Sequence, residues 1–230
     1  MRAVTDPALV EARVRKQFDV SSQPGKKDDL DGSAPDSSEA ALLLVDLIND
    51  FGFPGGDELL AGAAQIAGPI RQLKIRARAA GIPAIYVNDN FGRWQSSFKD
   101  VVERCLAPNV KGHCFVEQLK PEPEDYFVLK PKHSAFYQTP LDVLLKHLGT
   151  KRIVLAGLST NSCILITAND AYMRDLEVYV PSDCVATQTA EEQEYSLKHM
   201  ENVNKAIVCA SAEIDLEKLA GRSWPETLSG

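Results

Sequence analysis

The sequence of 230 residues predicts an α/β protein with a three-layer, doubly wound fold around a mostly parallel sheet of six strands. From Ala41 onward, short apolar runs alternate with longer stretches in which apolar residues recur at helical spacing. The short runs are apolar on both faces, which is typical of parallel strands covered by helices on each side. Right-handed connections between successive strands complete the predicted architecture.

The six predicted strands are brief and rich in β-branched or aliphatic residues. The first reads Ala-Leu-Leu-Leu-Val, and the fourth, which precedes Gly157, reads Arg-Ile-Val-Leu-Ala. In chain order, the predicted strands span 41–45, 83–88, 126–129, 152–156, 177–180 and 205–209.

The stretches between these strands predict helices because their apolar residues return every three or four positions. After Gly157, for example, Ile164, Thr167 and Ala171 follow this spacing. In chain order, the predicted helices span 58–80, 94–105, 141–148, 163–174 and 190–202.

Residues 1–38 differ in composition from the rest of the chain. The stretch 21–39 is crowded with Ser, Asp, Lys, Gly and Pro and has almost no large apolar side chain, so it cannot contribute much to a packed core. We expect residues 1–38 to form a polar, partly flexible N-terminal arm, and residues 39–230 to form one domain with its own core.

Composition and charge exclude several classes of partner. The net charge of −7 and the pI near 5.2 disfavour nucleic acid, because no basic cluster extends beyond the neighbourhood of Lys26 and Lys27. No apolar stretch reaches the roughly 18 to 20 residues that span a bilayer. The five cysteines are odd in number and widely spaced, which fits reduced thiols. We therefore expect a cytoplasmic protein with no nucleic-acid or membrane partner.

Three reactive side chains follow or end predicted strands. Asp46 follows the first strand, Lys130 follows the third, and Cys163 comes after the turn that follows the fourth. In doubly wound sheets the ligand crevice lies beyond the carboxyl ends of the strands. If these strands are neighbours, a carboxylate, an ammonium group and a thiol converge at one point.

These three groups together suit acyl transfer. Asp46 can remove the thiol proton and return it to a leaving group, and Lys130 supplies a fixed positive charge. Cys163 begins a predicted helix, so we expect backbone N–H groups and Lys130 to lower the pKa of its thiol. His133 could reach the rim of the pocket, but a conventional Cys–His dyad is not expected from the histidine positions.

At these positions the sequence resembles the isochorismatase-like cysteine hydrolases, which include nicotinamidases and N-carbamoylsarcosine amidohydrolase. The resemblance covers about residues 41–210. Three separated motifs carry it in the right order: Asp46 with Asn49-Asp50-Phe51, Lys130 with Ser134-Ala135-Phe136 and Thr139-Pro140-Leu141, and Gly157 with Thr160-Asn161 and Cys163.

The resemblance implies a Rossmann-like topology and a catalytic triad of Asp46, Lys130 and Cys163. It also implies a non-proline cis peptide bond, placed here between Ser159 and Thr160, and an oxyanion hole formed by the backbone N–H groups of Ser159 and Cys163. Family members often form homo-oligomers, so we expect one here.

Departures from the family pattern narrow the range of substrates that we expect. Ile48 stands where many members have Gln. Nicotinamidases bind a metal through an Asp-x-His pair and further histidines, but the corresponding stretch here, residues 88–94, contains Asp89 and no histidine. One carboxylate cannot hold zinc or iron, which need three or more donors. We therefore expect no metal, no other cofactor and a substrate other than nicotinamide.

The predicted function is hydrolysis of a C–N bond, an amide or ureide, in a small molecule through a covalent acyl-enzyme. Two alternatives stay open: vinyl ether hydrolysis of the isochorismatase type with Asp46 as the acid, and an inactive binding protein that keeps the fold. Arg93 could pair with a substrate carboxylate. The predicted pocket residues are Phe51, Asp89, Phe91, Arg93, Trp94, Phe136 and Tyr137.

Overall fold

The fold comes from a computed structural model, which describes residues 37–92 and 97–221. These residues belong to one compact unit that begins at Ala34. The predicted N-terminal arm lies almost entirely outside the described residues, so the boundary at residue 38 stays a prediction.

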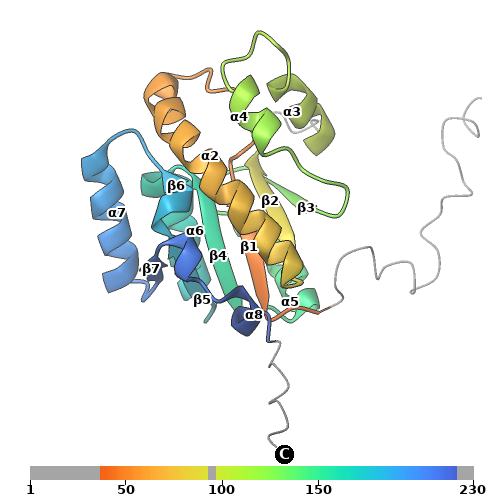
Figure 1. The fold of residues 1–230 in the computed structure, drawn as a ribbon, viewed down its shortest axis with the longest axis vertical. Helices are drawn as coiled ribbons and strands as arrows, with labels where there is room; N and C mark the ends of the chain where they lie inside the picture. The colour runs from red at the N-terminus through yellow and green to blue at the C-terminus, as the bar shows by residue number, and fades with distance from the viewer. Residues whose placement is uncertain (1–36, 93–96, 222–230) are drawn as a thin grey trace, which may run out of the picture. The chain divides into compact units, whose positions relative to one another are not determined.

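The described residues form a parallel sheet of seven strands, with helices on both faces (Figure 1). The strand order is β3-β2-β1-β4-β5-β7, and the short β6 pairs with the end of β4. Because β1 lies between β2 and β4, the chain builds outward from β1 in both directions, as a doubly wound sheet does. The strands are β1 (Ala40–Val45), β2 (Ala84–Asp89), β3 (Tyr126–Lys130), β4 (Arg152–Leu158), β5 (Glu177–Pro181), β6 (Val185–Ala186) and β7 (Ile207–Cys209).

Two hydrophobic layers separate the helices from the sheet. Along β1, Leu42 and Leu44 pack into one layer, whereas Leu43 and Val45 pack into the other, as the two-residue period of a strand requires. On the first face lie α2 (Gly56–Ala79), α3 (Phe98–Cys105), α4 (His113–Gln118) and α8 (Leu216–Leu219). On the other face lie α5 (Leu141–Leu148), α6 (Leu165–Tyr172) and α7 (Ala190–Asn202).

The predicted fold class is confirmed, with differences in detail. The sequence did not predict the strand β6 or the helices α4 and α8. β6 has two residues, and α4 and α8 have six and four, so none of these elements is long enough to show a period in the sequence. The second predicted helix begins at Phe98 because Ser97 and Asp100 form a capping box there; its predicted first residues, 94–96, lie outside the described residues.

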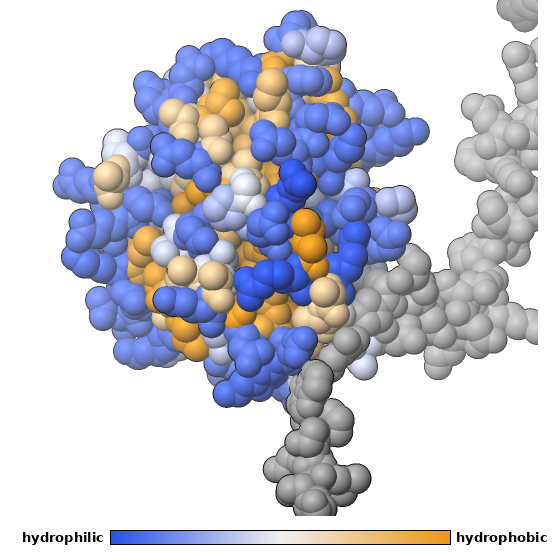
Figure 2. All heavy atoms as spheres, in the orientation of Figure 1, coloured by the Kyte–Doolittle hydropathy of each residue, from blue (hydrophilic) through white to orange (hydrophobic). Residues whose placement is uncertain are grey.

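Figure 1 shows α2 crossing one face of the sheet, with α3 and α4 beyond the carboxyl ends of β1 and β2. Figure 2 shows the same face of the molecule as largely hydrophilic, with hydrophobic residues scattered among the hydrophilic ones. Of the helices in the described part of the chain, none combines the length and the apolar character needed to cross a membrane.

Candidate active site

Asp46 is held at the carboxyl end of β1 by contacts with β2. The first strand is fully buried, and the chain turns at Asp46, whose φ of 51° lies in the left-handed region. Its backbone N–H donates to the carbonyl of Val87 at 2.9 Å, and its Oδ1 accepts from the N–H of Asp89 at 2.8 Å. The following turn is tied to β2 as well, since the amide side chain of Asn88 bonds both the N–H and the carbonyl of Ile48. These contacts leave Asp46 Oδ2 free to face Lys130.

Lys130, the last residue of β3, is completely buried and joins the other two groups. Its Nζ lies 2.9 Å from Asp46 Oδ2 and 3.3 Å from Cys163 Sγ. A third carboxylate, that of Asp89, lies 4.0 Å from Nζ. A buried ammonium group needs such partners because an unpaired charge in the interior is very costly. The structure therefore brings together the three reactive residues that the sequence singled out.

Cys163 lies in a π-helical turn, Thr160–Ile164, between β4 and α6. Before this turn, β4 closely approaches β1 at Gly157, which has a φ of 125°. A Cβ atom at this position would lie 2.0 Å from the carbonyl oxygen of Val45, so only glycine fits. Short turns of this kind are frequent at functional sites.

The predicted position of the cis peptide bond was wrong by one residue. The cis bond joins Leu158 to Ser159, not Ser159 to Thr160. β4 continues to Leu158, two residues beyond its predicted end, and the cis bond follows directly at the end of the strand.

The expected lowering of the thiol pKa was also wrong. Burial, reinforced by the negative charge of Asp46, raises the pKa of Cys163 to about 12, although Lys130 opposes this rise. For Lys130, burial acts to lower the pKa, but its interactions with Asp46 and Cys163 outweigh burial and raise the pKa above the ordinary value. The resting sulfur is therefore a thiol beside a carboxylate that can accept its proton and an ammonium group that can stabilise the resulting charge.

The loop after β3 is fastened to α6, the helix that follows Cys163. The hydroxyl of Ser134 donates to the carboxylate of Asp170, and the N–H of Ala135 donates to Thr167 Oγ1 at 3.0 Å. The hydroxyl of Thr139 closes the loop by donating to the carbonyl of Ala135 at 2.5 Å. These bonds fix the two motifs that carry Lys130 and Cys163 relative to each other.

The same loop brings His133 closer to the sulfur than the sequence indicated. His133 Nδ1 lies 3.6 Å from Cys163 Sγ and 3.2 Å from the hydroxyl of Ser162. The spacing of three residues from Lys130 was the signal in the sequence, but only the fold shows that the loop turns back toward Cys163.

The structure places the predicted pocket residues Asp89, Phe136 and Tyr137 in different surroundings. The Asp89 side chain is 42% exposed and contacts Lys130, so it is partly accessible next to the site. Phe136 packs in the same hydrophobic layer as Cys163, with the guanidinium group of Arg174 over its ring at 4.6 Å. Tyr137, by contrast, is 54% exposed.

Phe51 and Phe91 belong to the hydrophobic layer under α2, whereas Cys163 belongs to the other layer. Phe51 is fully buried in the α2 layer and packs edge-on against Phe115, and its assignment to the pocket stays a prediction. Phe91 packs against the same layer, under the guanidinium group of Arg104 at 4.4 Å. Arg93 and Trp94 lie outside the described residues.

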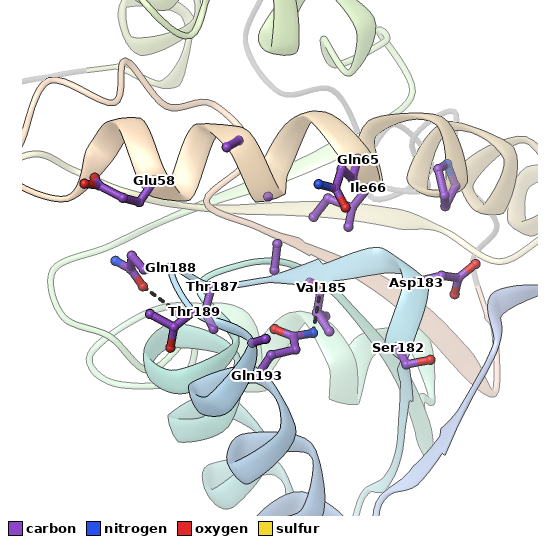
Figure 3. Close-up of a pocket in the computed structure, with 15 residues that line it drawn as sticks. Glu58, Gln65, Ile66, Ser182, Asp183, Val185, Thr187, Gln188, Thr189 and Gln193 are labelled. Carbon is purple, nitrogen blue, oxygen red and sulfur yellow. Dashed lines mark hydrogen bonds between the residues drawn. The ribbon is translucent and has the colours of Figure 1, made fainter.

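A cavity of about 560 Å³ lies elsewhere, between α2 and the segment from η4 (Ser182–Cys184) to α7 (Figure 3). None of the three reactive residues lines it. Two of its polar side chains are engaged with protein groups: Gln193 Nε2 donates to the carbonyl of Val185 at 3.0 Å, and Thr187 donates to Gln188 at 2.6 Å. Size alone therefore does not make this cavity the site of the chemistry.

Over residues 37–92 and 97–221, no three His, Cys, Asp or Glu side chains gather as metal ligands would. At the position of the nicotinamidase ligands, Asn88 is engaged with Ile48, and Asp89 is the nearby carboxylate. This donor set does not suit zinc or iron.

The chain matches known proteins over most of its length. The isochorismatase domain model matches residues 40–213. The isochorismatase family protein YaaI of Bacillus subtilis is 40% identical over 177 residues, which are 77% of this chain and 97% of that protein. The ureidoacrylate amidohydrolase RutB of Methylorubrum extorquens is 31% identical, and the match covers 72% of this chain and 77% of RutB.

A solved structure agrees with these matches. The N-carbamoylsarcosine amidase of Thermoplasma acidophilum superposes with a TM-score of 0.60 at 28% identity, over 77% of this chain and 99% of that one. The residues matched by the family model, 40–213, include the sheet and the three strand ends that carry the reactive side chains. The chain therefore belongs to the isochorismatase family, and it has a hydrolase fold shared with relatives that are named amidohydrolase and amidase.

Proposed function

We propose that this protein hydrolyses a C–N bond of a small amide or ureide, with Cys163 as the nucleophile and without a metal. The observation that carries the proposal is the position of Lys130 Nζ, which contacts both Asp46 Oδ2 and Cys163 Sγ inside the protein. A buried thiol, carboxylate and ammonium group in mutual contact are the parts that nucleophilic catalysis without histidine requires.

In the acylation step, Asp46 accepts the thiol proton while Sγ attacks the substrate carbonyl. The oxygen of the tetrahedral intermediate becomes negative, and the backbone N–H groups of Ser159 and Cys163 are proposed to stabilise it. The C–N bond then breaks, and Asp46 returns the proton to the nitrogen that leaves. The product of this step is a thioester on Cys163, with Asp46 again ionised.

In the second step, Asp46 removes a proton from water, and the resulting hydroxide attacks the thioester carbonyl. The C–S bond breaks, the acid product leaves, and the proton on Asp46 returns to the sulfur. Lys130 keeps its own proton throughout and lowers the energy of each state in which sulfur is negative. The raised pKa of Cys163 fits this cycle, because the thiolate forms only when Asp46 takes the proton.

The names of the relatives support an amide or ureide as the substrate class. RutB is named a ureidoacrylate amidohydrolase, and the structural relative is named an N-carbamoylsarcosine amidase. Both names describe cleavage of an amide bond in a small molecule. A homo-oligomer stays a prediction, as does cytoplasmic location.

The test is a panel of small amides, ureides and vinyl ethers, assayed with the intact protein and three variants. We expect Cys163→Ala and Asp46→Asn each to abolish turnover of an amide or ureide. The control is Cys184→Ala, which alters a second buried cysteine outside the site and should retain turnover. Vinyl ether turnover that survives Cys163→Ala but not Asp46→Asn would instead support the alternative reaction, and a panel with no turned-over compound would favour a binding protein.

A further inference from the structure

His133 occupies the side of the sulfur that faces solvent. Asp46 and Lys130 approach Sγ from the protein interior, where their side chains are 10% and 0% exposed. His133 is exposed, and its Nδ1 lies 3.6 Å from Sγ, within the range of a hydrogen bond to sulfur. Its loop is fixed to α6 by Ser134 and Ala135. The imidazole is thus held next to the reacting atom by the fold.

The charges around the sulfur disfavour a thiolate. Asp46 and Asp89 carry negative charge on one side, and Lys130 supplies the opposing positive charge. Burial adds to the cost, because a charge that loses water must be stabilised by protein groups. A second donor to Sγ would reduce this cost, and His133 is a side chain with a nitrogen in place to donate.

We propose that His133 is a further catalytic residue, which donates its Nδ1–H to Cys163 Sγ while the sulfur carries negative charge. The inference rests on the proposed function. The hydrogen bond strengthens as the thiol proton moves to Asp46, and again as the C–S bond of the thioester breaks. The imidazole keeps its proton in both steps, so the proton balance of the cycle is unchanged.

The neighbouring hydroxyl of Ser162 offers a competing role for His133. Nδ1 lies 3.2 Å from Ser162 Oγ. In this competing role, the imidazole would hold the Ser162 side chain in place and would not donate to the sulfur. The two roles differ in what they require. A role through Ser162 would make the loss of its hydroxyl as damaging as the loss of the imidazole, whereas donation to sulfur would not.

The experiment measures the rate at which iodoacetamide alkylates Cys163, followed by mass spectrometry of the peptide that contains it. The variants are His133→Ala, His133→Asn and Ser162→Ala, with His147→Gln as a control at an exposed histidine on α5. Asparagine can place an N–H close to the position of Nδ1, so it retains the donor but not the ring. Circular dichroism verifies that each variant is folded.

We expect His133→Ala to slow alkylation of Cys163 about tenfold, as the loss of a hydrogen bond to a charged group implies. His133→Asn should recover most of this rate, and Ser162→Ala and His147→Gln should react like the wild type. The value of kcat/KM for an amide or ureide substrate should follow the same order.

Two results would overturn the inference: a His133→Ala rate within about twofold of wild type, or equal losses in His133→Ala and Ser162→Ala. Alkylation needs no substrate, so it separates this inference from the proposed function. If the wild-type thiol reacts but does not depend on His133, only the inference fails. If wild-type Cys163 does not react at all, the inference fails, whereas the proposed function stands or falls with turnover of the substrate panel.

Discussion

Replacing Lys130 with methionine tests the buried charge at the centre of the site. Lys130 is fully buried, and its Nζ contacts Asp46 Oδ2 at 2.9 Å and Cys163 Sγ at 3.3 Å. Lys130→Met leaves the carboxylate of Asp46 without its partner, and breaking one side of a buried ion pair costs about 3–5 kcal/mol in the free energy of unfolding. The sulfur also loses a charged hydrogen bond of about 1.5–3 kcal/mol, which corresponds to a loss of about 10- to 100-fold in kcat/KM.

A matched control separates stability from catalysis. Lys74 is also buried and pairs with Asp125, but it contacts none of the three reactive residues. Lys74→Met should therefore lower the free energy of unfolding by a similar amount and leave kcat/KM nearly unchanged. Urea unfolding and steady-state kinetics on both variants are the assays. Wild-type kcat/KM in Lys130→Met, or an equal loss of kcat/KM in Lys74→Met, would refute the reasoning.

The pH dependence of this stability has a definite sign. The pKa of Lys130 is raised in the folded protein relative to the ordinary value of 10.5. A raised pKa means that the folded state binds the proton more tightly, so the contribution is complete below about pH 10.5 and is lost as the pH rises further. The difference in unfolding free energy between wild type and Lys130→Met should therefore be constant from about pH 7 to 9 and shrink above about pH 10.5.

Three further predictions concern the surroundings of the site. Because the pKa of Cys163 is raised to about 12, its rate of alkylation in the free enzyme should rise about tenfold per pH unit from about pH 7 to 10; a plateau near pH 8.5 would contradict this. Gly157→Ala should lower the free energy of unfolding by at least about 2 kcal/mol, measured with urea, whereas Gly68→Ala, in open space on α2, should raise it slightly. Asn88→Ala removes both bonds to Ile48 and should cost about 2 kcal/mol in urea unfolding, with a lower kcat; unchanged values would show that this bridge does not position the turn after β1.

Strand positions and the three reactive residues could be predicted from the sequence because both are local signals. An apolar run that ends in Asp46 or Lys130 is visible without coordinates, and so is Gly157 before a helical pattern. The order of the strands was not predicted, but the conclusion needed only that parallel strands end at one edge of the sheet.

Features that depend on contacts between distant segments could not be predicted in this way. The packing of Phe51 on Phe115 is one such feature, because Phe115 belongs to a short helix that the sequence did not indicate. The expectation of a low pKa for Cys163 took account of its position at the start of a helix but not of its burial beside Asp46. The burial has the larger effect on the pKa. His133 was recognised near the rim, but its distance from the sulfur depends on the bonds of the loop to α6.

Capture of the acyl-enzyme tests the central claim, that Cys163 forms a covalent bond with the substrate while Asp46 and Lys130 handle the proton and the charge. The measurement is intact-protein mass spectrometry of reactions quenched with acid during the first turnover of an amide or ureide from the panel. We predict a mass increase equal to the acyl group, located on Cys163 after digestion and absent from Cys163→Ala. Wild-type turnover by Cys163→Ala, or an acyl group found on a residue other than Cys163, would contradict the account.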